Sequence, residues 1–131
     1  MANREIEVIL SRHLADCLEL PIFITDLNGN LIFYNESAEQ ILGRKFEDSG
    51  VMPAEEWSVI FNPQDENGKN LPPDDLPLMK TLKTGQPAQG NFYITSLTGE
   101  THHLAVTSFP LIGHAKRYVA AMAIFWIKEM E

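Results

Sequence analysis

Ten consecutive residues near the end of the chain, 118–127, place apolar side chains on both faces of any strand that they form. They read Tyr-Val-Ala-Ala-Met-Ala-Ile-Phe-Trp-Ile. Successive side chains of a strand point to opposite faces, so a strand of this composition must be covered on both sides. The sequence therefore predicts a strand covered on one face by the helices of its own domain. On the other face we expect an N-terminal helix, a partner subunit, or both.

Shorter patterns predict four further strands. The strand-like runs 21–26 and 31–34 flank the dipeptide Asn28-Gly29, and such an arrangement is the strongest local signal for a β-hairpin. Two more strands are expected at 91–95 and 102–109, ahead of the last one at 117–127. Consecutive strands with short connections most simply pair as antiparallel neighbours.

Helices are expected mainly between the hairpin and the last three strands. Asn35 can cap a short helix over 36–42. Residues 44–72 contain prolines and a turn signal and favour one or two short helical turns and a loop. A further helix opens at 72–75 and ends at Gly85. Its expected buried stripe consists of Leu76, Met79 and Leu82, with Leu78 as a further candidate. The whole pattern predicts an α+β fold.

An amphipathic helix is also expected at the N-terminus, over 4–18, before Pro21 ends it. Its apolar stripe is formed by Ile6, Ile9, Leu10, His13, Leu14, Cys17 and Leu18. The sheet face that it can cover is predicted to carry His103, Ala105, Thr107 and Phe109 together with Ala121, Ala123 and Phe125. Large exposed apolar patches are uncommon on monomers. We therefore expect a homodimer through the N-terminal helix and this outer sheet face.

The charge balance narrows the classes of partner. The chain has 131 residues, with 18 acidic and 10 basic side chains and a formal net charge of −8. Nucleic acids and anionic membranes are bound through basic surfaces, so we expect neither as a partner. Cys17 is the only cysteine and cannot form a disulfide within the chain, which favours a reducing, cytoplasmic setting.

No group of residues predicts catalysis. His102 and His103 are adjacent, so on a strand they point to opposite faces and cannot hold one metal ion. The spacings of common hydrolase, metal and phosphate-binding motifs do not occur. We therefore expect a protein that is not an enzyme and has no metal site.

Three segments together resemble the PAS domain, in its bacterial sensory-box form. The first segment, 26–43, contains an acidic residue, a Gly turn and a strand, followed by Asn, Ala, Leu and Gly. The second segment is 67–87. The third segment, 98–111, contains a strand and the proline that closes it, Pro110. The resemblance implies a five-stranded antiparallel sheet of order 2-1-5-4-3 with helices on one face. It divides the chain into an N-terminal helix, 1–20, and a PAS domain, 21–131. Family members serve in histidine kinases, cyclic-dinucleotide enzymes and transcription regulators, which makes a kinase or regulator domain the expected effector.

The resemblance also bears on cofactors. Flavin photoreceptors of this family need a cysteine in a helix that lines the pocket, whereas Cys17 precedes the first strand. Its best-known haem sensors place an axial histidine in the helix before the third strand, and residues 73–84 contain no histidine. Covalent-type flavin and axial-His haem are therefore disfavoured, and the cofactor is left open.

What remains is a general cavity on the inner face of the sheet. Leu104, Val106 and Ser108 share a strand parity with His102, which would lie at the pocket end of the strand and offer a hydrogen bond. The other expected wall residues are Trp57, Phe61, Met79, Leu82, Phe92 and Ile94. The alternative for these six residues is plain core packing, and the alternative for His102 is a half-exposed histidine at the end of the strand. Two functions follow: a sensor that holds a small apolar or aromatic molecule, or a ligand-free module for dimerisation or docking.

Overall fold

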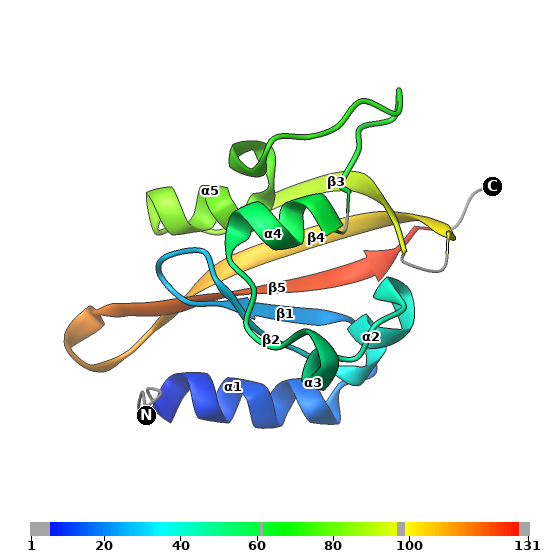
Figure 1. The fold of residues 1–131 in the computed structure, drawn as a ribbon. Helices are drawn as coiled ribbons and strands as arrows, with labels where there is room; N and C mark the ends of the chain where they lie inside the picture. Colours follow the sequence, from blue (N-terminus) through cyan, green and yellow to red (C-terminus); the bar gives the residue numbers. More distant parts are fainter. Residues whose placement is uncertain (1–5, 61, 97–98, 129–131) are drawn as a thin grey trace.

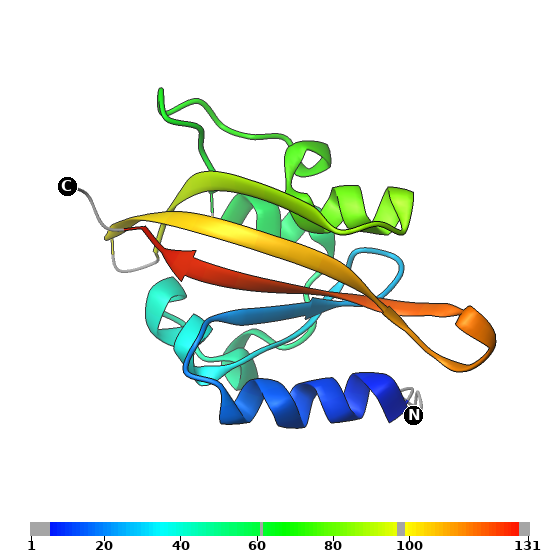
Figure 2. The ribbon, with the colours of Figure 1, turned by 180° about the vertical axis from the view of Figure 1, so that it is seen from behind.

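The chain forms helices on both sides of an antiparallel sheet (Figures 1 and 2). The structure is a computed structural model that describes residues 6–60, 62–96 and 99–128. The elements follow in the order α1 (Ile6–Cys17), β1 (Ile22–Thr25), β2 (Leu31–Tyr34), α2 (Glu36–Leu42), α3 (Phe46–Ser49), α4 (Ala54–Ile60), the 3-10 turn η1 (Pro73–Asp75), α5 (Pro77–Thr84), β3 (Ala88–Thr95), β4 (Thr101–Ile112), the 3-10 turn η2 (His114–Lys116) and β5 (Tyr118–Ile127).

The sheet has five strands in the order β2-β1-β5-β4-β3, and every neighbouring pair is antiparallel. The predicted α+β class, strand order and hairpin are confirmed. The hairpin turns at Gly29, whose φ of 86° lies in the left-handed region that glycine adopts without strain. Strand β5 is central, as its two apolar faces require.

The two faces of β5 are the reverse of the prediction. Val106 of β4 pairs with Phe125, and Ser108 pairs with Ala123, so these residues share the inner face with the core. Ala120 and Met122 lie on the other face, in the cluster that includes α1. The assignment of Ala121, Ala123 and Phe125 to the outer face was therefore wrong. Because the run is apolar at both parities, the pairing with β4 decides which side chains point inward.

Helix α1 packs on the outer face, opposite α2, α4 and α5 (Figure 2). It buries Val8 and Ala15, which are 3% and 0% exposed, against Ile24, Phe33 and Met122 of the sheet. The expected stripe makes this contact only through Leu18, just after the end of α1. Four of its members are 41–63% exposed: Ile6, Ile9, Leu10 and Leu14. Small side chains let the helix approach the sheet closely, and the larger ones are left facing outward.

Arg12 also lies on the packed side of α1. Its guanidinium stands 4.6 Å from the ring centroid of Phe33, a cation–π contact. Phe33 in turn meets Phe46 edge-on at 5.6 Å, so the contact links α1 through the sheet edge to α3.

Helix α5 covers the inner face beside β3, β4 and β5 (Figure 1). The opening predicted at 72–75 is the short turn η1, and Gly85 ends α5 with a φ of 69°. Leu76 and Leu78 are buried as expected, but Met79 and Leu82 are only partly buried. Thr81 takes their place on the sheet side because a hydrogen bond to Ser108 satisfies its hydroxyl.

Candidate functional site

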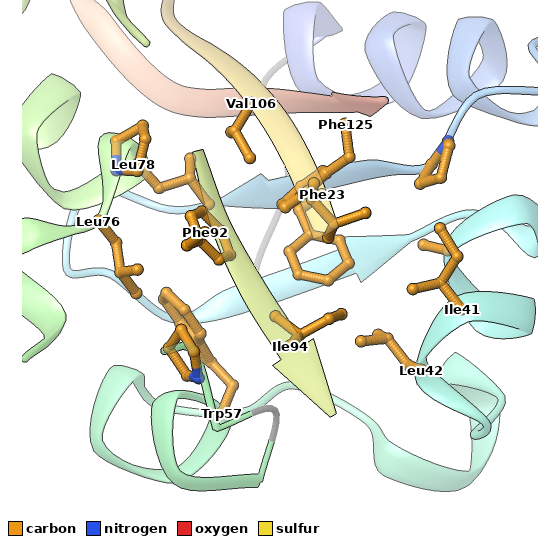
Figure 3. A pocket seen from close by; sticks show the side chains of 15 residues that line it. Phe23, Ile41, Leu42, Trp57, Leu76, Leu78, Phe92, Ile94, Val106 and Phe125 are labelled. Atoms are coloured by element: carbon orange, nitrogen blue, oxygen red, sulfur yellow. The ribbon is translucent and has the colours of Figure 1, made fainter. Parts of the chain in front are cut away.

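A small cavity lies between the inner face of the sheet and the helices that cover it (Figure 3). Its volume is about 40 Å³. A single water molecule needs roughly 10–15 Å³, and a cavity of about 150 Å³ holds benzene. At rest the cavity therefore accommodates a molecule of only a few atoms.

Aromatic rings from three strands form one side of this cavity. The Phe125 ring lies 4.8 Å from that of Phe23 and 6.2 Å from that of Phe92, measured between centroids. The rings meet tilted or edge-on, which are favourable aromatic geometries. Phe125 thereby joins β1, β5 and β3 around the cavity (Figure 3).

Trp57 of α4 closes the cavity from the opposite side. Its indole Nε1 donates a hydrogen bond of 3.0 Å to the carbonyl oxygen of Gly29, in the β1–β2 turn. The polar edge of the ring is thus satisfied outside the cavity, and its apolar surface is left for the wall. The bond also ties α4 to the hairpin.

Five of the predicted wall residues line the cavity: Trp57, Phe92, Ile94, Leu104 and Val106. Sequence reasoning missed three groups of lining residues. They are Pro21 and Phe23 at β1; Ala38, Ile41 and Leu42 on α2; and Pro63, Leu76, Pro77, Leu78 and Phe125. Strand parity within the hairpin is the signal that points to Phe23, and Phe125 had been placed on the wrong face.

The other predicted site residues lie elsewhere. Met79 rests against Gly29, with its Cε 3.3 Å from the position that a Cβ of Gly29 would take. Leu82 lines a separate groove beside α5. Ser108 is buried and its hydroxyl forms a hydrogen bond with that of Thr81. Phe61 lies outside the described residues.

His102 has the predicted parity but does not reach the cavity. It pairs with Ile94 at the start of β4, and its Nε2 stands 3.8 Å from a carboxylate oxygen of Glu100. On the outer face, His103 stacks on Tyr93 with ring centroids 4.2 Å apart, a cross-strand contact that the sequence did not reveal.

The lining offers no ionisable side chain to a ligand. Tyr34 is a titratable group in the surrounding core, and its hydroxyl lies 3.0 Å from both the Arg44 carbonyl oxygen and the Ser49 hydroxyl. Burial raises the pKa of Tyr34 above its ordinary value near 10, and the charge of Glu39 adds to this shift. Tyr34 is therefore held as a neutral phenol.

These residues do not fit a flavin or a haem. Both groups are far larger than a cavity of about 40 Å³, and the lining contains neither cysteine nor histidine. Cys17 is exposed at the end of α1, the helix that packs on the outer face of the sheet. Within the part of the chain that the structure describes, no cluster of side chains suits a metal ion.

The order of the strands, the helices on the inner face and the apolar cavity can be compared with known proteins. A family model described as the PAS domain matches residues 19–126. The chain belongs to the PAS domain family. Members of this family serve in sensing and signal transduction.

Solved structures show the same fold. A PAS domain from Colwellia psychrerythraea has a TM-score of 0.64 at 18% identity, covering 92% of this chain and 97% of its own. The PAS domain of BvgS from Bordetella pertussis has a TM-score of 0.61 at 14% identity, covering 95% and 88%. The Rhodobacter sphaeroides LOV protein has a TM-score of 0.73 at 13% identity, covering 95% of this chain and 69% of its own. At these identities the similarity establishes the fold.

No curated protein sequence matches this PAS domain. Among the described residues, no helix has the length and apolar character needed to cross a membrane.

Proposed function

We propose that this PAS domain is a sensory module whose core cavity takes a small apolar or aromatic molecule and relays its presence to a partner or effector. One observation carries the proposal: an all-apolar cavity is walled by α2, α4, α5 and by strands β1, β3, β4 and β5. Apolar cavities of this kind stay dry and bind apolar molecules. An occupant would therefore press on the helices and on the sheet at once.

Strand β5 supplies a route for the relay. Phe125 lines the cavity on its inner face, whereas Ala120 and Met122 of the same strand pack with α1 on the outer face. Interiors are close-packed, so a displacement of Phe125 is passed to the strand that carries α1. A benzene-sized occupant requires such a displacement because the resting cavity is too small for it.

The proposed role involves no catalytic step, as we expect from the sequence. The composition supports a cytoplasmic setting as an expectation, and the effector would be a kinase or regulator domain. One structural relative is the LOV domain of a blue-light activated histidine kinase from Erythrobacter litoralis.

Methyl NMR with ethylbenzene as a probe tests ligand binding. We expect saturable shifts at the methyl groups of Leu78 and Val106, and a native mass spectrum of the purified protein should show any molecule that it already holds. The Val106→Ile variant adds one methyl group to the cavity wall and should weaken ethylbenzene binding. Ala105→Val adds bulk to the other face of the same strand and should leave binding unchanged. Absence of any shift in the wild type contradicts the sensor proposal.

The second candidate is a module that leaves its core empty and acts by forming a homodimer. It is favoured by the exposed stripe on α1, where Ile6, Ile9, Leu10 and Leu14 face away from their own sheet. The partner that covers this stripe would be a second copy of the chain, as expected from the sequence. Among the structural relatives, the fungal photoreceptor Vivid has a light-state dimer.

Size-exclusion chromatography with light scattering tests this candidate. We expect a dimer for the full chain and a monomer for the chain lacking residues 1–20. Leu10→Glu should also give a monomer, whereas Val59→Glu, which charges an exposed apolar side chain on α4, should leave the dimer intact. A strict monomer for the unaltered chain rules the homodimer out.

A further inference from the structure

A second hollow lies beside the core cavity, at the C-terminal end of α5. We call it the α5 groove. Its volume is about 320 Å³, within the range of roughly 300–1,000 Å³ that small-molecule sites occupy. Its lining includes Leu27 of the β1–β2 turn, Thr81 and Thr84 of α5, Pro110 of β4, and Tyr118 and Ala121 of β5.

The α5 groove and the core cavity lie along the same inner-face row of β4. Val106 lines the core cavity and Pro110 lines the groove, with Ser108 between them. These residues alternate with outward-facing ones, so all three point toward α5. Helix α5 repeats the order, because Leu78 lines the core cavity and Thr81, one turn later, lines the groove.

Strands β5 and β1 follow the same order. On β5, Phe125 lines the core cavity and Ala121 lines the groove, with Ala123 between them and paired with Ser108. On β1, Phe23 lines the core cavity, and the chain reaches Leu27 at the groove four residues later. The two hollows therefore occupy one layer between α5 and the sheet, with a short partition between them.

A hydrogen bond between two buried hydroxyls forms this partition. Thr81 Oγ1 lies 2.6 Å from Ser108 Oγ, and the two residues are fully enclosed. Hydroxyls both donate and accept, and they can exchange one partner for another by rotation. A ligand hydroxyl or carbonyl can therefore replace this bond without leaving either group unpaired.

A third buried hydroxyl on this side of the sheet has no partner. Thr25 is 0% exposed, and its Oγ1 makes no hydrogen bond to any described residue. It pairs across the sheet with Ala121, so its side chain shares the face that forms the groove floor. Buried polar groups are nearly always hydrogen-bonded, and an orphaned one indicates a missing partner.

We propose that the α5 groove and the core cavity are the two ends of one binding path, closed at rest by the Thr81–Ser108 bond, for a neutral amphipathic molecule. Its apolar end enters the core cavity and its hydrogen-bonding end bonds to the hydroxyls of Thr81 and Ser108, beside the part of the floor that carries Thr25. This inference rests on the proposed sensor function and adds the entrance and the class of ligand.

The groove favours a neutral polar end over a carboxylate. The hydroxyls of Thr81 and Ser108 can each donate and accept, so they suit an alcohol or a carbonyl. Lys83 lines the groove, but its side chain is 57% exposed and its Nζ lies 3.0 Å from Asp74, so its charge is already paired at the surface. No other described cation lines the groove.

Three probes with the same phenyl ring test the ligand class: 2-phenylethanol, ethylbenzene and phenylacetate. In methyl NMR titrations, we expect 2-phenylethanol to shift Leu78 and Val106 in the core, Thr81 at the partition and Thr25 on the floor of the groove. Ethylbenzene should shift the core methyl groups alone, and phenylacetate should bind at least about tenfold more weakly than 2-phenylethanol.

Two variants test the path. Ser108→Ala removes the closing bond and should raise the association rate of 2-phenylethanol about fivefold, whereas Thr107→Ala on the outer face of β4 should not change it. Thr84→Trp places a large ring at the groove rim and should slow association and weaken binding. The control, Lys80→Trp, substitutes an exposed position of α5 outside the groove lining.

The outcomes separate this inference from the sensor proposal. One outcome refutes the path and leaves the sensor proposal supported. In that outcome 2-phenylethanol shifts only the core methyl groups, and Ser108→Ala and Thr84→Trp bind it like their controls. Tighter binding of phenylacetate than of 2-phenylethanol refutes the neutral ligand class. If no probe binds anywhere, both proposals fall.

Discussion

The side-chain amide of Asn35 donates a hydrogen bond of 2.8 Å to the carbonyl oxygen of Ala15, and so joins the end of α1 to the start of α2. The same amide donates to Leu20 O at 2.8 Å, and its oxygen accepts from the backbone of Ile22 and Ala38. Asn35 caps α2 as the sequence predicted, but it also holds α1 and β1. One buried side chain therefore fixes α1 relative to the core.

Replacing Asn35 with alanine should destabilise the domain by about 2–4 kcal/mol, because several buried backbone groups lose their partner at once. Urea unfolding measures this loss, and hydrogen exchange should show faster exchange in the last turn of α1. Asn91→Ala, at an exposed position of β3, should change stability by less than about 0.5 kcal/mol. Equal effects from the two variants contradict the role given to Asn35.

The inward orientation of Phe125 can be tested against its neighbour. Phe125 is 6% exposed and Trp126 is 41% exposed. Phe125→Ala should cost about 3–5 kcal/mol because it opens a cavity in the core, and Trp126→Ala should cost clearly less. Urea unfolding of both variants provides the measurement. A larger loss for Trp126→Ala than for Phe125→Ala would show that Phe125 points to the outer face, as first inferred from the sequence.

The Thr81–Ser108 bond should appear as a coupling energy. Thr81→Val and Ser108→Ala each leave one buried hydroxyl without its main partner and should each cost about 1–3 kcal/mol. The double variant should cost less than the sum, by roughly 1 kcal/mol, because no hydroxyl is then orphaned. A double-mutant cycle from urea unfolding measures this term, and strict additivity shows that the two hydroxyls do not interact.

Stability at high pH should depend on Tyr34. Its pKa is raised in the folded state, chiefly by burial, so its contribution is present below the unfolded pKa near 10 and is lost as the pH rises through the folded value. Between about pH 9 and pH 11, the wild type should lose more stability than Tyr34→Phe, which cannot ionise. Thermal unfolding across this range provides the comparison. Parallel curves for the two proteins would show that the pKa of Tyr34 is the same in the folded and the unfolded state, which contradicts the prediction.

The sequence indicated the elements well because their signals are local. Asn28-Gly29 marked the hairpin, Asn35 the cap of α2, and Gly85 the end of α5. Five wall residues of the cavity followed from strand parity and apolar character. The site was incomplete for two reasons. Many of its other residues come from α2, the hairpin and the start of α5, and only packing brings these segments to the last three strands, while Phe125 had been assigned to the wrong face.

The sequence by itself determined the order of elements and the coverage of β5 on both faces, since these depend on turns, caps and apolar runs. The PAS-like fold followed from the resemblance of three segments to that family. The tertiary structure alone decided which face of β5 points inward, which side of α1 packs, and that Thr81 is buried in place of Met79 and Leu82. Apolar spacing gives the period of a strand or helix. Where both faces are apolar, this spacing does not tell which side chains point inward. Pairing with residues distant in the sequence, such as Val106 and Ser108, then decides it.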